Sequence, residues 1–517
     1  MAEILIKNGT VVDGVSKVSK KADVLVAKGK IVDIGPNLNP KAKTIINAKD
    51  CFVTPGFVDI QNHSDSYLTL LEQPEQSSLL TQGITTIVVG NCGSSLAPLP
   101  SREAIKSVQK WHNLAGVNIN WDSFEEFLVS LSGLKLGVNV ASLVGHATIR
   151  RGLIGDQARK LSEEEVRVLE KLLKAALDQG AIGLSLGLVY AHEVDSSADE
   201  LIRLAKIVKQ SGKYLSVHLR SETANITESI DEAIFLAAQT GVKVKISHLK
   251  IRGPSNWHLF EHVLNKIENA YHQGIDISFD VYPYSSTWAV LYTYLPKWAY
   301  EGGRAQISRH LASGVDRRKI LDYLRHQELG FERIVIASAS GNKAFVGKSI
   351  AQIAKNQSVS GEEALINLLS GLEGSIIVFD HNLSDEQVEL FVSSPLSVIA
   401  TDGAGYSRKT EDLVHPRCFG AIPKFLQMVR EKKLMTWEQA VRKITSEPAR
   451  IAGLDLGVIS KDKAADLVVF NPNEIVGKAD YNYPNQLPVG IKTVLVSGVQ
   501  SVEGNMLHQA AGRVIRK

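Results

Sequence analysis

The feature that most constrains the fold of this chain is a repeated alternation of apolar runs with amphipathic stretches, which begins near Pro55. Apolar runs separated by helix-like stretches are typical of βα units that build a parallel sheet. The predicted strands are FVDIQNH (57–63), TTIVVGNCG (85–93), VNVASLVGH (138–146), AIGLSLGL (181–188), YLSVHLR (214–220), VKVKISHLK (242–250), DISFDVYPY (276–284) and LSVIATDG (396–403). Eight such strands are the number found in an α/β barrel.

Two helices between and after these strands have clear start signals. Ser162 with Glu165, and Thr436 with Gln439, fit the capping-box pattern, in which two side chains satisfy free N–H groups at a helix start. The first of these helices is expected to stop at Gly180.

An irregular, aromatic stretch interrupts the alternation at about 285–340 and includes Trp288 and Tyr300. This composition suits an inserted cap near the mouth of a substrate site, and a plain surface subdomain fits it equally well. Two further apolar runs, 333–340 and 375–382, exceed the eight strands. Periodicity does not decide whether they belong to the barrel or to the insertion.

Both ends of the chain consist of short alternating strands with glycine turns, which predict small β units. They form either two separate β domains or one β-sandwich, since chain termini often lie close together. The expected division is a β-sandwich from 1–54 with 454–517, and a barrel domain from 55–453 with the insertion at about 285–340.

Composition excludes several classes of protein. Lys+Arg minus Asp+Glu is 58 − 55 = +3 over 517 residues, without the concentrated basic surface that nucleic-acid binding requires. Three widely spaced cysteines favour free thiols in a reducing compartment. Charged residues interrupt the N-terminal apolar stretch, and no apolar run approaches 18 residues. We therefore predict a cytoplasmic protein with no membrane segment.

Residues able to carry chemistry gather at the ends of the predicted strands, which meet on one face of a parallel barrel. These residues are His63, Cys92, His146, His218, His248 and Asp402. A thiolate and imidazoles suit a borderline-soft ion, so Cys92, His218 and His248 are candidate Zn²⁺ ligands. Taken singly, a buried cysteine can be a small hydrophobe, and a histidine at a strand end can be a hydrogen-bonded polar group.

Asp402 ends the last predicted strand. A carboxylate beside a metal could act as general base and then return the proton to a departing amine. The alternative role of Asp402 is an N-cap for the segment that follows.

Two local patterns, and one alternative role for Cys92, predict other enzymes. Residues 258–262 fit the H-x-x-E-H zinc-peptidase pattern, but they lie in a predicted outer helix, away from the strand ends. Residues 183–187 fit the G-x-S-x-G pattern of serine hydrolases, but they lie inside a strand, so Ser185 is expected to point into the barrel. Cys92 could also be a thiol nucleophile, which would survive a chelator.

Several phrases together resemble the N-acyl-D-amino-acid deacylase (D-aminoacylase) branch of the amidohydrolase superfamily. They are PGFVDIQNHSDS (55–66), GITTIVVGNCGSSLAP (83–98), LVGHATIRRG (143–152), VHLRSE (217–222), ISHLK (246–250), DVYPY (280–284), ATDG (400–403) and HPRCFG (415–420). The resemblance implies a (β/α)₈ TIM-like barrel, a small β-sandwich domain from both chain ends and an inserted small subdomain. It also implies metal-dependent hydrolysis of the amide of an N-acyl-D-amino acid, a small-molecule substrate.

The resemblance assigns roles to individual residues. It implies metal ligands at Cys92, His218 and His248, a catalytic aspartate at Asp402, and substrate-carboxylate binding by Lys250, by Tyr282 or Tyr284, and by Arg417. The forked donors of Arg417 suit a carboxylate. Glu222 is a candidate group behind the ligands, although a solvated carboxylate at a helix start is the expected description.

One departure from the family concerns the first strand, where a His-x-His pair is expected and this chain has Gln61 and His63. An amide is a poorer metal ligand than an imidazole, so the first metal position should be weak or vestigial. We therefore expect one Zn²⁺ per chain, with His63 as a spare or hydrogen-bonding group.

Two alternatives to the deacylase stay open at this point. One is a cyclic-amide hydrolase of the hydantoinase or dihydropyrimidinase kind, which resembles this group in fold but bridges two metals with a carbamylated lysine. The other is a non-catalytic scaffold that keeps the fold. The acyl group, the preferred side chain, the stereospecificity and the oligomeric state do not follow from the sequence.

Overall fold

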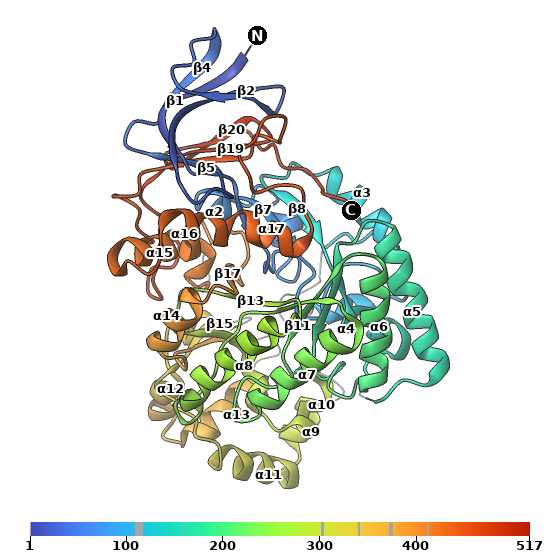
Figure 1. Ribbon diagram of the computed structural model, residues 1–517. Helices are drawn as coiled ribbons and strands as arrows, with labels where there is room; N and C mark the ends of the chain where they lie inside the picture. Colours follow the sequence, from blue (N-terminus) through green and yellow to red (C-terminus); the bar gives the residue numbers. More distant parts are fainter. Residues whose placement is uncertain are drawn as a thin grey trace.

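The computed structural model of the chain describes residues 2–108, 117–157, 159–300, 304–339, 342–371, 376–410 and 413–517 (Figure 1). Its centre is a set of parallel strands in two sheets, ordered β6-β7-β8 and β17-β13-β12-β11-β10-β9. The strands are β6 (Phe57–Asp59), β7 (Ile84–Val89), β8 (Asn139–Ser142), β9 (Val144–Gly145), β10 (Gly183–Gly187), β11 (Tyr214–His218), β12 (Lys243–Ile246), β13 (Ile277–Val281) and β17 (Ser397–Ile399).

The two parallel sheets form one barrel. β8 and β9 are consecutive pieces of the third predicted strand, and they pair with β7 and β10 respectively. On the other side, a parallel bridge between Asn62 and Gly403 connects the first strand to the last. Asp59 reinforces this closure because its carboxylate accepts hydrogen bonds from the backbone N–H and the hydroxyl of Thr401, at 2.9 and 2.5 Å. The structure is thus a TIM-type barrel with an additional domain.

Long helices cover the barrel on its outer side, and α5 (Glu163–Asp178), α6 (Ala198–Gln210), α7 (Ile226–Thr240) and α8 (Phe260–His272) lie side by side (Figure 1). Both predicted capping boxes are confirmed. Ser162 and Glu165 open α5, which ends two residues before Gly180. Thr436 and Gln439 open α16 (Trp437–Ile444).

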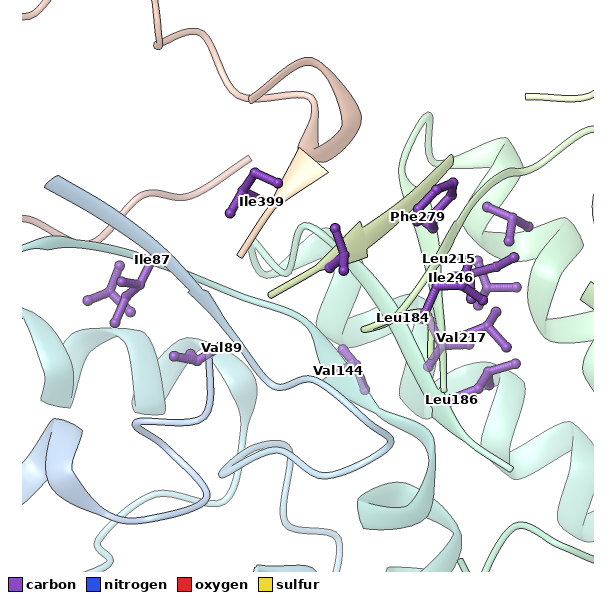
Figure 2. Close-up of a cluster of buried hydrophobic side chains, with 14 of the residues drawn as sticks. Ile87, Val89, Val144, Leu184, Leu186, Leu215, Val217, Ile246, Phe279 and Ile399 are labelled. Carbon is purple, nitrogen blue, oxygen red and sulfur yellow. The ribbon is translucent and has the colours of Figure 1, made fainter. Parts of the chain in front are cut away.

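Side chains of the barrel strands alternate between the helices and the interior. Leu184 and Leu186 of β10 belong to the large apolar core that the helices share (Figure 2). Ser185 between them is fully buried, as are Ser216 and Lys245 at the corresponding positions of β11 and β12. Because successive strand residues face opposite sides, these polar groups point into the barrel. The interior therefore has a polar layer beneath the strand ends.

The two ends of the chain meet in one mixed sheet of nine strands. Its strands are β1 (Ala2–Val11), β2 (Lys20–Ala27), β3 (Lys30–Gly35), β4 (Ala42–Asn47), β5 (Phe52–Pro55), β18 (Leu467–Phe470), β19 (Ile491–Val496), β20 (Val499–Glu503) and β21 (Met506–Leu507). The two halves join where β5 pairs with β18 in antiparallel register. β1 pairs with β4 at one end and with β5 at the other, and the sheet encloses an apolar core of its own.

A third sheet is inserted between β13 and β17. It is antiparallel, with β14 (Thr287–Val290) and β15 (Ile334–Ala339) on either side of β16 (Ile376–Asp380). The two surplus apolar runs thus lie in this sheet and not in the barrel. The sheet extends beyond residue 340, and the limits of 285–340, 1–54, 55–453 and 454–517 stay predictions as domain boundaries.

Further helices complete the structure. They are α1 (Thr69–Glu72), α2 (Ser77–Leu80), α3 (Phe124–Ser132), α4 (His146–Ile154), α9 (Lys297–Tyr300), α10 (Arg304–Ala312), α11 (Gly314–Arg325), α12 (Ile350–Gln357), α13 (Gly361–Gly371), α14 (Asp385–Ser393), α15 (Arg417–Lys432) and α17 (Ser446–Ala452). α10 to α13 pack against the inserted sheet. Of the helices described, none combines the length and the apolarity that crossing a membrane requires.

Candidate active site

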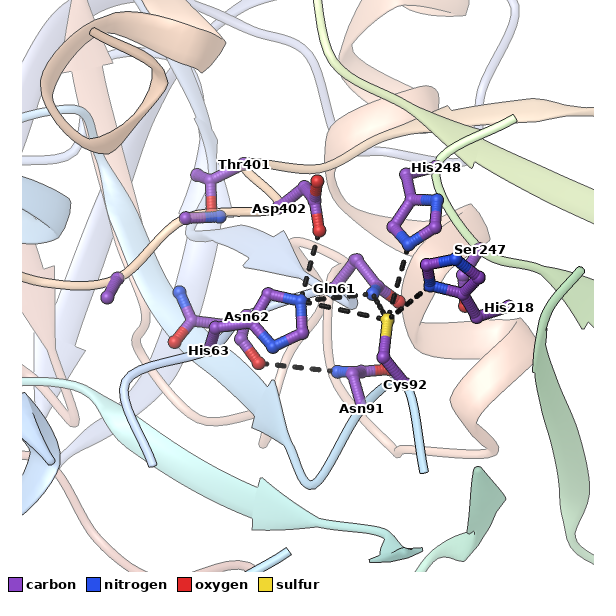
Figure 3. Close-up of polar contacts among 12 residues, drawn as sticks. Gln61, Asn62, His63, Asn91, Cys92, His218, Ser247, His248, Thr401 and Asp402 are labelled. Atoms are coloured by element: carbon purple, nitrogen blue, oxygen red, sulfur yellow. Dashed lines mark hydrogen bonds and ion pairs between the residues drawn. The ribbon is translucent and has the colours of Figure 1, made fainter. Parts of the chain in front are cut away.

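Four strands bring residues at or just beyond their ends to one point inside the mouth of the barrel (Figure 3). Cys92 follows β7, His218 ends β11, His248 follows β12 and Asp402 follows β17. Three of these residues have left-handed backbone conformations, with φ of 53° at Cys92, 37° at His248 and 47° at Asp402. Such values are strained for residues other than glycine, and strain of this kind is found preferentially at functional sites.

Cys92, His218 and His248 form a compact, buried group. The Cys92 Sγ lies 3.2 Å from His248 Nε2 and 3.4 Å from His218 Nδ1. The three candidate ligand atoms all lie within 4.8 Å of one another, and no other cluster of this kind occurs in the described ranges. Burial raises the pKa of the Cys92 thiol, but His248 and His218 outweigh this effect and hold the pKa well below its usual value. A thiolate with two imidazoles is a donor set that fits Zn²⁺.

Glu222 contacts both histidines of this group on their ring nitrogens that face away from Cys92. Its Oε1 lies 3.3 Å from His248 Nδ1, 3.6 Å from His218 Nε2 and 2.6 Å from Lys250 Nζ. The side chain is only 8% exposed, so the expectation of a solvated carboxylate at a helix start is wrong. A carboxylate behind a histidine ligand orients the ring and raises its basicity.

Asp402 lies beside this group and pairs with His63 and Arg417. Its Oδ1 lies 3.0 Å from His63 Nε2, and its Oδ2 lies 2.7 Å from Arg417 Nη1. Burial raises the pKa of Asp402, but Arg417 and His248 together hold it well below its usual value. For His63, burial acts downward, whereas the hydrogen bond to Asp402 and the nearby Cys92 raise the pKa to about 10. His63 therefore pairs with Asp402 in this structure, at 3.8 Å from the Cys92 Sγ.

Gln61 stands where the resemblance described above leads us to expect a histidine. Its Nε2 donates to the Cys92 Sγ at 3.1 Å and lies 3.4 Å from His63 Nε2. Its Oε1 accepts from Lys245 Nζ at 2.5 Å, and the same ammonium lies 2.6 Å from Asp280 Oδ2. Gln61, Lys245 and Asp280 are all fully buried. Lys245 and Asp280 were not predicted as site residues, although charged residues inside the predicted strands 242–250 and 276–284 were a visible signal.

A pocket of about 440 Å³ opens above the four strand ends. Lys250, Tyr282 and Arg417 line it, and the Arg417 guanidinium lies over the Tyr282 ring at 4.5 Å. Tyr284 is buried outside the lining, where the ammonium of Lys424 lies 4.1 Å from its ring centre. Of the two tyrosines considered, the structure thus places Tyr282 at the pocket. Strand β14 of the inserted sheet contributes an apolar wall with Trp288, Ala289 and Val290, and Tyr292 in the turn after β14 extends this wall.

Two models of the amidohydrolase family match the sequence, at residues 44–320 and 352–500. The first alone spans more than half of the 517 residues. The chain belongs to the amidohydrolase family.

Known relatives place this amidohydrolase more closely. It is 29% identical to the N-acyl-D-glutamate deacylase of Alcaligenes xylosoxydans xylosoxydans over 100% of this chain and 96% of that protein. The D-aminoacylase of the same organism is 27% identical over 100% of this chain and 98% of the relative. The zinc and phosphonate-inhibitor complex of the N-acyl-D-glutamate deacylase from Bordetella bronchiseptica has a TM-score of 0.85 at 28% identity, with both chains fully covered. The resemblance to this branch is therefore confirmed.

A D-hydantoinase structure is more distant. It has a TM-score of 0.57 at 15% identity and covers 100% of this chain and 99% of that chain, which shows a shared fold alone.

The two rival motifs of this amidohydrolase do not build sites in the part of the chain that the structure describes. His258 lies in the 3-10 turn Pro254–Leu259, whereas Glu261 and His262 lie in the first turn of α8. Among the described residues, these three do not form a potential metal-binding group. Ser185 points into the barrel as expected, where its hydroxyl donates to the carbonyl of Gly90 at 2.5 Å. It also accepts from the N–H of Gly93 at 3.0 Å, so it helps to hold the loop that carries Cys92.

Proposed function

We propose that this amidohydrolase is a metal-dependent deacylase that hydrolyses the amide bond of N-acyl-D-amino acids to a carboxylate and a free D-amino acid. The observation that carries the proposal is the buried group of Cys92, His218 and His248, which faces Asp402 at the floor of a pocket with a cationic wall. The names of the full-length relatives agree with this activity.

Cys92, His218 and His248 would hold the metal, which we take to be one Zn²⁺ per chain. A bound zinc ion supplies Lewis acidity, which polarises an amide carbonyl and makes water more acidic. His63 would not be a full ligand, because Asp402 already occupies its Nε2.

Arg417, Tyr282 and Lys250 would bind the carboxylate of the substrate. The Tyr282 hydroxyl and the Arg417 Nε are buried polar atoms with no hydrogen-bond partner among the described residues, and both residues line the pocket. Buried donors of this kind normally have an acceptor, and a substrate carboxylate would supply one. Binding at this point would fix the amide relative to the strand ends and would select one stereochemistry.

Asp402 would act as general base. Its carboxylate would take a proton from the attacking water and pass it to the nitrogen of the leaving amine. Arg417 currently lies against Asp402, and a substrate carboxylate would compete for this guanidinium. Losing part of that contact would raise the pKa of Asp402 from its depressed value, which would make the carboxylate a better base when substrate is present.

The pocket also indicates which amino acids would be preferred. Its cationic side chains are paired with carboxylates as follows: Lys106 with Glu103, Arg151 with Asp156, Arg220 with Glu232, Lys250 with Glu222, and Arg417 with Asp402. Arg252 also lines the pocket, but no carboxylate in the described ranges lies within 4.0 Å of its guanidinium, and its Nε is buried without a partner. It contacts the Tyr294 phenol, which donates to Asp380. A second carboxylate on the substrate would balance this charge, so acidic D-amino acids are the expected substrates.

The test of the proposed function combines metal analysis with a substrate panel. Zinc per chain is measured in purified protein, and amine release is followed from N-acetyl-D-amino acids, their L-enantiomers and a hydantoin, with and without prior chelation. We expect D-selective release that chelation abolishes and zinc restores. Release that survives chelation would indicate Cys92 as a thiol nucleophile. Ring opening without deacylation would favour the cyclic-amide hydrolase, and no turnover would favour the scaffold.

A further inference from the structure

The Gln61 amide is held in one orientation by a buried lysine. Lys245 Nζ lies 2.5 Å from Gln61 Oε1, and an ammonium has only donors to offer. The amide must therefore turn its oxygen to Lys245, which leaves its NH₂ facing the Cys92 Sγ and His63. The orientation follows from the chemistry of Lys245, and Asp280 balances the buried charge at 2.6 Å.

This orientation has a consequence for the space between Gln61, His63, Cys92 and Asp402. A metal ion in this space would face the NH₂ group of the amide, whose N–H groups repel a cation. It would not face the lone pair that a metal ligand must offer. Rotating the amide to present its oxygen would leave the Lys245 ammonium against an NH₂ group in a fully buried position, where neither donor would have an acceptor in the other. His63 is also engaged by Asp402.

We propose that Lys245 acts as a built-in cation that closes the second metal position, so that this enzyme binds a single zinc ion. The lysine charge, transmitted through the Gln61 amide, reaches the side of the Cys92 sulfur where a second metal would otherwise bind. Lys245 and Asp280 are thus positioning residues of the metal centre, and they touch neither the substrate nor the zinc. This inference rests on the proposed zinc group of Cys92, His218 and His248. It adds that each chain binds no more than one zinc ion.

The experiment measures zinc stoichiometry. Wild-type protein is equilibrated with a tenfold excess of zinc, freed of unbound metal and analysed for zinc per chain, and binding is also followed by calorimetric titration. We expect one zinc per chain and a single binding step. Two zinc ions in the wild-type protein would overturn the inference without the need for any variant.

Two variants separate the contribution of Lys245 from that of Gln61. Gln61→His alone restores the missing imidazole but retains the buried ammonium, and we expect it still to bind one zinc. The triple variant Gln61→His, Lys245→Gln, Asp280→Asn removes the lysine charge without leaving a lone buried carboxylate, and we expect it to bind two. If Gln61→His binds two zinc ions, the missing imidazole alone sets the stoichiometry, and the proposed role of Lys245 is overturned. A folded triple variant that binds only one zinc ion would also overturn that role.

The stoichiometry is independent of the assay for the proposed function. One zinc per chain without any amine release would refute the substrate assignment and leave the role of Lys245 intact. Wild-type protein that binds no zinc would refute both the proposed metal-dependent function and the role of Lys245. Circular dichroism at the assay temperature establishes that each variant is folded.

Discussion

Arg417 Nη1 lies 2.7 Å from Asp402 Oδ2, so the residue proposed to bind the substrate carboxylate also contacts the proposed general base. Under the proposed function, this one guanidinium would contact two carboxylates, that of Asp402 and that of the substrate. Binding and proton transfer should be linked through this contact.

Asp402→Asn should retain zinc and lose turnover. The amide is close to the carboxylate in shape but does not accept a proton at neutral pH, so we expect kcat to fall by roughly 10²- to 10⁴-fold. The measurement is steady-state kinetics together with zinc per chain. A variant that keeps wild-type kcat would eliminate Asp402 as the base.

Arg417→Met should change both substrate binding and the pH profile. Loss of a charged hydrogen bond of about 1.5 to 3 kcal/mol should raise KM by roughly 10- to 100-fold. Because Arg417 lowers the pKa of Asp402, its removal should raise that pKa, and activity should be lost at a higher pH on the acid side. Arg417→Lys retains a charge and should restore part of the shift. An unchanged acid limb in Arg417→Met would contradict the link.

Cys92→Ala and His248→Ala should lose stoichiometric zinc, because each removes one of three protein ligands. Cys418→Ala is a matched control, since Cys418 is likewise buried in the core but lies outside the group that could hold the metal. We expect zinc per chain to be unchanged in this control. Equal zinc loss in all three variants would indicate unfolding and not ligand removal, so each variant is also checked by thermal unfolding.

Arg252→Met should reduce the preference for acidic substrates. If its guanidinium pairs with a second carboxylate, the ratio of kcat/KM for N-acetyl-D-glutamate to that for N-acetyl-D-glutamine should fall by roughly 10- to 100-fold. Lys106→Met is the control, because Lys106 also lines the pocket but is already paired with Glu103. A ratio that drops equally in both variants would assign the preference to general electrostatics.

Asp59→Asn should alter how stability depends on pH. Burial outweighs the hydrogen bonds of Thr401 and Asn62 and raises the pKa of Asp59 to about 6 from 3.8. The folded state then binds more protons than the unfolded state between pH 4 and 6, so the wild-type protein loses stability as pH rises through this window, by up to about 3 kcal/mol. The variant has no carboxyl group at this position, so its unfolding free energy relative to that of wild type should increase from pH 4 to pH 7. Denaturant unfolding of both proteins at pH 4 and at pH 7 measures this difference. A difference that is the same at the two pH values would contradict the prediction.

Much of the fold could be read from the sequence because hydrophobic periodicity reports burial directly. The eight strand runs and both capping boxes follow from local patterns. The two surplus apolar runs could not be assigned, because a buried antiparallel strand and a buried parallel strand have the same apolar composition. Only pairing partners distant in the chain distinguish them.

The candidate site was predictable to the extent that it depends on strand ends. Cys92, His218, His248 and Asp402 each lie at such an end, and a parallel barrel brings strand ends together. The burial of Glu222 was not predictable, because its partner Lys250 comes from the next strand along the barrel. The contact of Lys245 with Gln61 likewise joins residues 184 positions apart. The metal ligation, the residue roles and the cytoplasmic location stay predictions.

The pairing of β5 with β18 has a consequence for synthesis. Strands β1 to β5 leave the ribosome long before β18, which pairs with β5 and begins at Leu467. At typical rates of elongation, roughly 20 to 80 s separate the two segments. During that interval β5 presents an unpaired edge, which is a hazard for association with other nascent chains. The edge of β5 stays open while the barrel strands are synthesised, and it closes only when β18 pairs with it.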